Sequence, residues 1–341
     1  MTVPATYQTT DSLHVDFDAS LQLGYSEPLA VGVKRVALEQ FELAAAGFFD
    51  GEDLFAEAVH EARKSVKRVR SLLRLVRGEL TDRIYRYEDM ALRDTGKMLA
   101  SPRSSVSVVS AAGVIKDLYG EFLADGTFDE MISRLARRRD VIQLQTMEDP
   151  ALVVKVVRNL EKAHGRYSTW PTDPDARQVY GMGIRDEYAA IAPGLHATYA
   201  GGRGEMVTAY SKPTDPNFHQ WRKKVKYLRH QMEFLAPLWP EVVVGTAVTL
   251  DRLGFLLGED HDLAELTTLL RGRPELCPNP RERSLFFALA TQRRAELKVA
   301  AEILGRRVYA EKPGSFQGRF GEYWVSRRLA LDASLDTLAV Y

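Results

Sequence analysis

Apolar residues recur three and four positions apart along almost the whole chain from Ser26 onward. This spacing is typical of amphipathic helices, whereas the strict alternation that predicts strands forms no convincing run. Glycine and proline residues separate the helical runs from one another. The pattern predicts helices over residues 26–49, 53–77, 82–101, 102–119, 128–147, 150–164, 176–199, 216–235, 242–270, 280–304 and 320–338. We therefore predict an all-α fold of antiparallel helices with short connections.

Two segments without lasting periodicity suggest how the helices are divided. Residues 1–25 predict an N-terminal tail or arm, and residues 166–175, within a stretch that contains prolines and turn formers, predict a linker. The two expected halves are residues 26–165 and 176–341. Within the second half, the glycine-rich run Ala200–Gly204 predicts a further turn.

An eleven-residue pattern occurs once in each expected half. Residues His60–Arg70 match residues His219–Arg229 as H-x-x-R-K-x-V-K-x-[VL]-R, so that seven of the eleven positions are identical or nearly so. A match of this kind indicates an internal repeat. On a helix, each copy has one apolar face and one positive face, which we call the first and second basic stripes. The first basic stripe contains His60, Arg63, Lys64, Lys67, Ser71 and Arg74, and the second contains His219, Arg222, Lys223, Lys226 and His230.

The charges of the chain balance, with 46 Lys and Arg against 46 Asp and Glu. An anion-binding surface therefore requires the cations to be gathered in one region, and the basic stripes gather them on one face of each helix. Like charges three and four residues apart destabilise a helix by about 0.2–0.5 kcal/mol per pair. Either an anionic partner binds the stripes, or acids of neighbouring helices pair with them. The acids available for such pairing are Glu88, Asp89, Asp94, Glu259, Asp260 and Asp262.

In these motifs the sequence resembles the CHAD family, the conserved histidine α-helical domain. The resemblance rests on the first basic stripe, on Phe218–Pro240 and on Leu257–Leu270, with smaller matches at Ala91–Leu99 and Gly194–Arg203. It extends over about residues 26–338, which is nearly the whole chain.

The resemblance implies two four-helix bundles related by a pseudo-two-fold axis. It also implies a basic central groove or pore that binds inorganic polyphosphate, with association to polyphosphate granules. The chain departs from the family at Arg103-Ser104, where the family often has Arg-Asp. The expected polyphosphate contacts are His60, Arg63, Lys64, Lys67, Arg70, Arg74, Arg93, Lys97, Arg103, Tyr199, Arg203, His219, Arg222, Lys223, Lys226 and Arg229.

The basic stripes suit a polymer of phosphates. Cations at positions i, i+3, i+4 and i+7 recur about every 5 Å along a helix, so they can follow a chain of phosphates. Arginine offers a planar fork of donors and lysine a movable charge. Release of counterions should make binding strongly dependent on salt. Protonation of His60 and His219 is expected to strengthen binding as the pH falls.

Neither a metal site nor a catalytic site is predicted. The chain has no HxxxH or HExxH pair, and the acidic run Glu259–Asp262 is interpreted as a turn that caps a following helix. The glycine run Gly201–Gly204 lacks the spacing of a phosphate-binding loop, and no nucleophile–base pair is evident. We therefore expect a protein that is not an enzyme and needs no cofactor.

Nucleic-acid binding and docking of acidic proteins remain the alternative functions. Bases would require exposed aromatic rings among the cations. Trp221 lies on the apolar face, and Tyr227 is the only aromatic residue that could flank the second basic stripe.

No stretch approaches about 18 uninterrupted apolar residues, so no membrane partner is expected. The N-terminus has no signal-peptide pattern, which together with the lone Cys277 predicts a cytoplasmic protein.

Overall fold

The computed structural model describes residues 19–24, 27–49, 55–170, 172 and 187–338. Every regular element in these residues is helical, which confirms the all-α prediction. No helix in the described part of the chain is both long and apolar enough to cross a membrane. The α-helices are α1 (Leu29–Ala46), α2 (Phe55–Leu75), α3 (Asp82–Met98), α4 (Ala100–Tyr119), α5 (Asp129–Met147), α6 (Pro150–Ser168), α8 (Glu187–Ser211), α9 (Asp215–Phe234), α10 (Pro240–Gly272), α11 (Pro280–Val308) and α12 (Pro313–Leu338).

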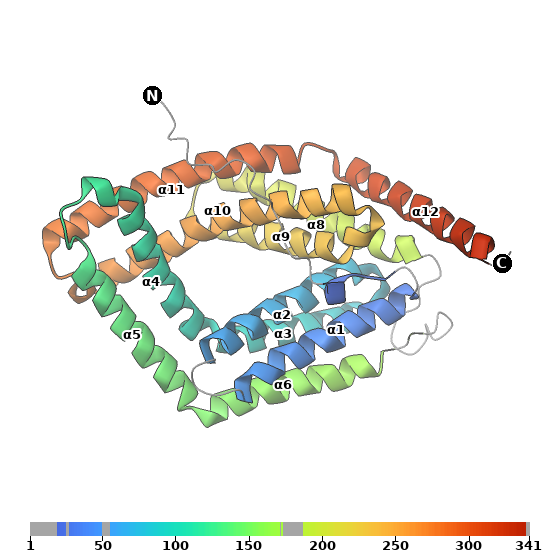
Figure 1. The fold of residues 1–341 in the computed structure, drawn as a ribbon, viewed down its shortest axis with the longest axis horizontal. Coiled ribbons are helices and arrows are strands. Elements are labelled where there is room, and N and C mark those ends of the chain that lie inside the picture. Colours follow the sequence, from blue (N-terminus) through green and yellow to red (C-terminus); the bar gives the residue numbers. More distant parts are fainter. Residues whose placement is uncertain (1–18, 25–26, 50–54, 171, 173–186, 339–341) are drawn as a thin grey trace.

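The helices form two groups that meet where α2 packs against α8 and α9 (Figure 1). Helices α1, α2, α3 and α6 lie together, and α8 to α12 lie on the other side, while α4 and α5 extend from the first group to the second. The turn between α4 and α5 packs on α11, because the Phe128 ring meets that of Phe286 edge to face at 5.6 Å between ring centroids. The backbone N–H of Phe128 also donates to Glu282 Oε2 at 3.2 Å. Hence α4 and α5 contact both groups.

The two helices that carry the basic stripes, α2 and α9, pack directly against each other. The Ser71 hydroxyl of α2 donates to the carbonyl of Tyr227 on α9 at 2.7 Å. Near it, the Gln231 amide donates to the hydroxyl of Thr198 on α8 at 3.0 Å. All of these side chains are buried, and these hydrogen bonds pair the Ser71 hydroxyl and the Gln231 amide nitrogen, while Gln231 Oε1 has no hydrogen-bond partner among the described residues.

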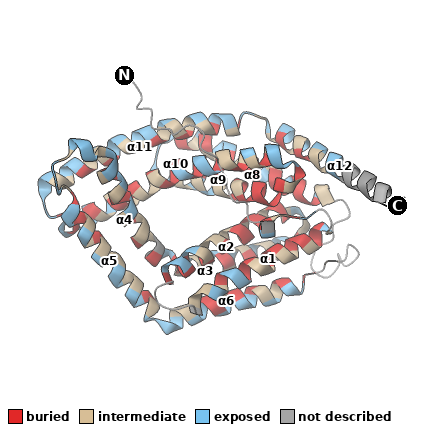
Figure 2. Cartoon of the chain, viewed as in Figure 1, coloured by how far each residue is buried: buried red, intermediate tan, exposed pale blue. Residues whose placement is uncertain are grey.

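The predicted apolar faces of α2 and α9 are buried, as expected (Figure 2). Each of these side chains is at most 3% exposed, and full burial of a side chain of this size contributes about 1.5–3 kcal/mol. The buried face of α2 contains Val59, Ala62, Val66, Val69, Leu73 and Val76, and that of α9 contains Phe218, Trp221, Val225, Leu228 and Met232.

Two positions assigned to the positive faces are buried instead. Ser71 is 0% exposed and His230 is 5% exposed. They occupy the same place in the repeat, and each lies where α2 and α9 cross. His230 Nδ1 lies 2.7 Å from Glu233 Oε2, and burial lowers the pKa of its imidazole. The basic stripes are therefore interrupted at the crossing.

Two predicted breaks in the second half lie inside helices. The glycine-rich run Ala200–Gly204 is part of α8, where a Cβ at Gly202 would overlap the Tyr309 hydroxyl, so this glycine allows close packing. The acidic run Glu259–Asp262 lies in the middle of the 33-residue helix α10, so the expected cap is wrong. The low helix propensity of glycine and aspartate is a weak preference, and tertiary contacts override it in both segments.

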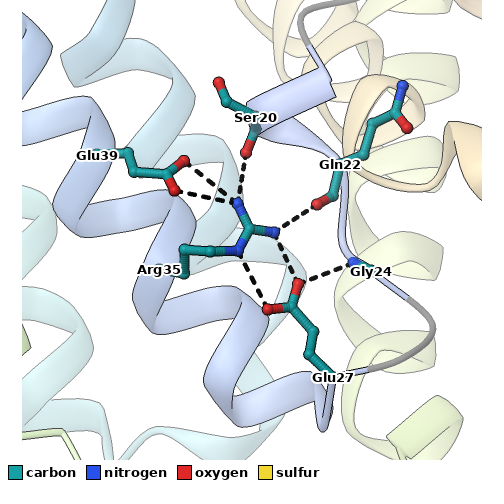
Figure 3. Close-up of polar contacts among 6 residues, drawn as sticks. All are labelled: Ser20, Gln22, Gly24, Glu27, Arg35 and Glu39. Atoms are coloured by element: carbon teal, nitrogen blue, oxygen red, sulfur yellow. Dashed lines mark hydrogen bonds and ion pairs between the residues drawn. The ribbon is translucent and has the colours of Figure 1, made fainter.

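The last residues of the predicted N-terminal arm belong to the core. Leu21 and Leu23 are 1% and 5% exposed, and the N–H of Leu23 donates to the carbonyl of Phe234 at the end of α9 at 3.0 Å. The Arg35 guanidinium of α1 anchors this segment (Figure 3). It donates to the carbonyls of Ser20 at 2.8 Å and Gln22 at 2.7 Å and pairs with Glu27 at 2.7 Å and Glu39 at 3.2 Å. Residues 1–18 and 25 lie outside the described residues.

The predicted linker begins inside a helix. Arg166 and the residues up to Ser168 belong to α6. Tyr167 and Trp170 are both buried and stack with 4.0 Å between ring centroids. The remainder of the predicted linker, apart from residue 172, lies outside the described residues.

Candidate anion-binding surface

Four cations from the two repeat helices gather where α2 and α9 cross, and we call them the crossing cluster. They are Arg70 and Arg74 of α2 and Lys223 and Lys224 of α9. The Tyr227 ring lies between the helices, with the Arg74 guanidinium 4.0 Å and that of Arg70 5.9 Å from its centroid. Burial lowers the pKa of the Lys223 ammonium, and repulsion from Arg70, Arg74 and Lys224 lowers it further. These positive charges are therefore close enough to repel one another.

Asp89 of α3 is the carboxylate that pairs with this cluster. It lies 2.9 Å from Arg70 and 2.9 Å from Arg74. Although burial raises the pKa of Asp89, hydrogen bonding to Arg70 and the charges of both arginines hold it below its ordinary value. Glu205 of α8 acts on Lys223 more weakly than the cations do. The crossing cluster therefore keeps an excess of positive charge.

The other acids considered for pairing have mostly different partners. Glu88 pairs with Arg166 at 2.7 Å. Glu259 and Asp260 pair with Arg293 at 2.7 Å and Arg294 at 2.8 Å. None of these three arginines lies on a basic stripe, so these three acids do not pair with the stripes.

Further cations of the basic stripes lie against α3 and α10. The Arg63 guanidinium donates to the carbonyl of Gly96 at 2.5 Å. The Arg222 guanidinium lies against Gly258 of α10, where a Cβ would be 3.4 Å from its Nη2. Burial and the neighbouring charge of Arg222 lower the pKa of the Lys226 ammonium to about 8, against a partial offset by Asp262. Lys226 is thus a cation that begins to lose its charge just above neutral pH.

His219 does not behave as the sequence led us to expect. Burial, and then the neighbouring His261 at 4.4 Å between ring centroids, lower the pKa of its imidazole to about 4. The lowered pKa makes the neutral form of the His219 imidazole the main one at physiological pH while no anion is bound, which does not favour a contribution of its protonation to binding there.

One group of side chains could hold a cation. His261, Asp262 and Glu265 each place a ligand atom within 4.8 Å of the others. Glu265 already pairs with His261 at 3.3 Å and accepts from the Ser104 hydroxyl at 3.1 Å. The charges of Arg222 and Lys226 nearby disfavour a bound cation, so we assign no metal to this group.

The comparisons with known proteins agree with the motifs. The CHAD domain profile matches residues 35–271, which is more than half of the chain. The chain belongs to the CHAD family. Among solved structures it is similar to PptA from Streptomyces chartreusis, with a TM-score of 0.51 and 14% identity over 82% of this chain and 99% of that chain. At this identity the likeness shows a shared fold alone. No curated protein matches the sequence.

Several expected contact residues of this CHAD domain lie on its outer surface. Lys64 pairs with Glu61 at 2.9 Å, and Asp94 pairs with both Arg93 at 3.2 Å and Lys97 at 3.4 Å. Pairs at the surface are worth about 0–1 kcal/mol, so an anion could displace them at little cost. His60 and Arg203 are exposed as well. The side chain of Arg103 lies outside the described residues.

Two expected contact residues are held by contacts within the protein. Tyr199 is 0% exposed, stacks on Phe316 with 4.0 Å between ring centroids, and donates to the carbonyl of Val308 at 2.9 Å. Arg229 is held by Asp251 at 2.7 Å and by Glu233 at 3.1 Å. In this chain both residues stabilise the packing of the helices. A polymer could reach Tyr199 only if the contact between α8 and α12 opened.

Lys224 is the member of the crossing cluster that the sequence analysis missed. In the repeat pattern, Lys224 is the variable position that corresponds to Ser65, which is buried. A comparison of the two copies therefore excluded it. The sequence did indicate Lys224, because it completes a run of three consecutive cations, Arg222-Lys223-Lys224, where the first copy has only two.

Proposed function

We propose that this CHAD protein binds inorganic polyphosphate, without chemically changing it, on the crossing cluster and the adjoining basic stripes. The observation that carries the proposal is the convergence of cations from both repeats where α2 and α9 cross. Arg70 and Arg74 come from the first copy, and Lys223 and Lys224 come from the second. A surface of this kind attracts a polyanion and has no need of bases to recognise it.

The chemistry of the cluster suits such a polymer. Two arginines offer forked donors to phosphate oxygens, and two lysines offer movable charges. Neutralising several phosphates releases counterions, so affinity should fall steeply with salt. Asp89 is held by two arginines and is not available as a base or a metal ligand, which supports binding without catalysis.

We further propose that the chain is a pair of four-helix bundles related by a pseudo-two-fold axis. In the repeat, Ser71 corresponds to His230 and Arg68 to Tyr227. Ser71 bonds to Tyr227, and the charge of Arg68 acts on the pKa of His230. Exchanged pairs of this kind are what a two-fold axis through the crossing would produce. The halves would comprise residues 26–165 and 176–341, and the protein would be cytoplasmic and associated with polyphosphate granules.

The test is a titration with long-chain polyphosphate, single-stranded RNA and duplex DNA at two salt concentrations. The informative variant is Lys223→Glu, because Lys223 donates to Gln220 at 3.1 Å and forms no ion pair with any residue that the structure describes. The matched control is Lys162→Glu on the exposed surface of α6.

We expect tight, salt-sensitive binding of polyphosphate, weakened at least about tenfold by Lys223→Glu and unchanged by Lys162→Glu. Equal or tighter binding of nucleic acid would transfer the assignment to the nucleic-acid alternative. Failure to bind any of these polyanions would refute the proposal.

A further inference from the structure

A pocket of about 320 Å³ adjoins the crossing cluster where the end of α2 meets α8 and α9. Three cations and two tyrosines contribute to its wall, and no acidic side chain does. A concave site with a few convergent polar groups is the usual form of a small-ligand site. The lining residues are Arg74, Arg77, Gly78, Tyr85, Pro193, Gly194, Ala197, Thr198, Lys224 and Tyr227.

One side of the pocket is closed by backbone. A Cβ at Gly194 would overlap the carbonyl oxygens of Arg74 and Leu75, so α8 touches the end of α2 without an intervening side chain. Pro193 lies beside it, and a Cβ at Gly78 would be 3.7 Å from the proline ring. A polymer that enters the pocket therefore meets a wall of backbone.

The two arginines of the pocket are held in place. The Arg74 guanidinium lies 4.0 Å from the Tyr227 ring centroid, and that of Arg77 lies 4.4 Å from the Tyr85 ring centroid. Arg77 also donates to the carbonyl of Leu80 at 2.9 Å and pairs with Asp82. Arg74 lies in the last turn of α2 and Arg77 lies two residues beyond its end, where the helix dipole attracts cations. Structural roles therefore account for these two residues.

Lys224 has no such structural role. It comes from α9, and it forms no hydrogen bond or ion pair with any described residue of the chain. Its side chain extends along Gly201, where a Cβ would be 3.4 Å from the ammonium. A third cation, brought from another helix without an acid to pair with, indicates an anionic ligand.

We propose that this pocket binds the terminal phosphate of a polyphosphate chain, an inference that rests on the proposed function. A terminal phosphate has a second ionisation near pH 6, as a phosphate monoester has, so it carries more charge than an internal one. Three cations and a closed wall suit such an end group. Arg74 and Lys224 belong to both sites, so a chain that ends in the pocket continues onto the crossing cluster.

The experiment compares linear tripolyphosphate, which has two end groups, with cyclic trimetaphosphate, which has none. Both are titrated into the full chain and into Lys224→Ala, Arg77→Ala and the exposed control Lys162→Ala, and the fold of each variant is checked by circular dichroism. We expect the native chain to bind the linear probe at least about tenfold more tightly. Arg77→Ala, which changes the pocket and not the crossing cluster, should remove about tenfold of linear binding and leave cyclic binding unchanged. Lys224→Ala, which changes both sites, should weaken linear binding more than cyclic binding.

Long-chain polyphosphate is titrated in parallel, so that the two proposals fail in different ways. Equal binding of the linear and cyclic probes, or equal losses of both in Arg77→Ala, would overturn the end-group site even if long chains bind tightly. Absence of long-chain binding, with linear binding that depends on Arg77, would refute the proposed function and support a pocket for short linear phosphates.

Discussion

Asp89 lies 2.9 Å from both Arg70 and Arg74, and it competes with any anion for these two arginines. The substitution Asp89→Asn removes its charge and keeps its shape. The three side chains are 21%, 15% and 18% exposed, so the ion pairs are mostly but not fully removed from water. Removing one partner of a buried pair costs about 3–5 kcal/mol, and partial exposure reduces this figure. We expect the free energy of unfolding to fall by about 2 kcal/mol.

The same substitution should strengthen the binding of polyphosphate. A charge about 4 Å from a phosphate in water repels it by about 1 kcal/mol, which corresponds to a roughly fivefold change in affinity. Urea unfolding with and without long-chain polyphosphate measures both effects. Polyphosphate at about 100 times its dissociation constant should raise the free energy of unfolding of the variant by about 2.7 kcal/mol.

The pH dependence provides a second check on Asp89. Its pKa in the folded chain is below the ordinary value of 3.8, so its ionised form stabilises the fold above that pH. This contribution is lost as the pH falls through the folded pKa. The difference in stability between the native chain and Asp89→Asn should therefore shrink below about pH 4. A variant that is less stable but binds polyphosphate no more tightly would refute the view that Asp89 competes with the ligand.

Three further predictions follow from other contacts. The pKa of Lys226 is about 8, so the contribution of its charge to polyphosphate affinity should be lost between pH 7 and 9 in the native chain. Lys226→Arg should retain this contribution, and titration with polyphosphate at each pH measures the difference. Gly194→Ala should lower the free energy of unfolding by about 1–3 kcal/mol, because a Cβ there overlaps backbone of α2. Gly204→Ala, in open space on the same helix, should instead be neutral or stabilising by up to about 1 kcal/mol in urea unfolding. Arg35→Ala should increase hydrogen exchange at Leu23, and unchanged protection would show that Arg35 does not hold the segment.

Much of the fold could be predicted because it depends on local periodicity. The apolar face of α2 begins near Val59 and recurs with helical spacing to Val76, and every predicted member is buried. The start of α6 at Pro150 was predicted, whereas α12 begins at Pro313 and not at the predicted residue 320. The glycine run Ala200–Gly204 misled us because the contact with Tyr309 that it permits is 105 or more residues away in the sequence.

The sequence by itself determined that the chain is all-α, that a basic motif is repeated, and that it is a CHAD protein. These properties lie in residue spacing within single helices, which a linear pattern contains in full. Only the tertiary structure decided which cations remain available. It paired Arg70 and Arg74 with Asp89, placed Tyr199 in the core and brought Lys224 to the end of α2. These outcomes depend on how α2 and α9 cross and on which helix each acid faces. The periodicity of a single helix does not determine how helices pack against one another.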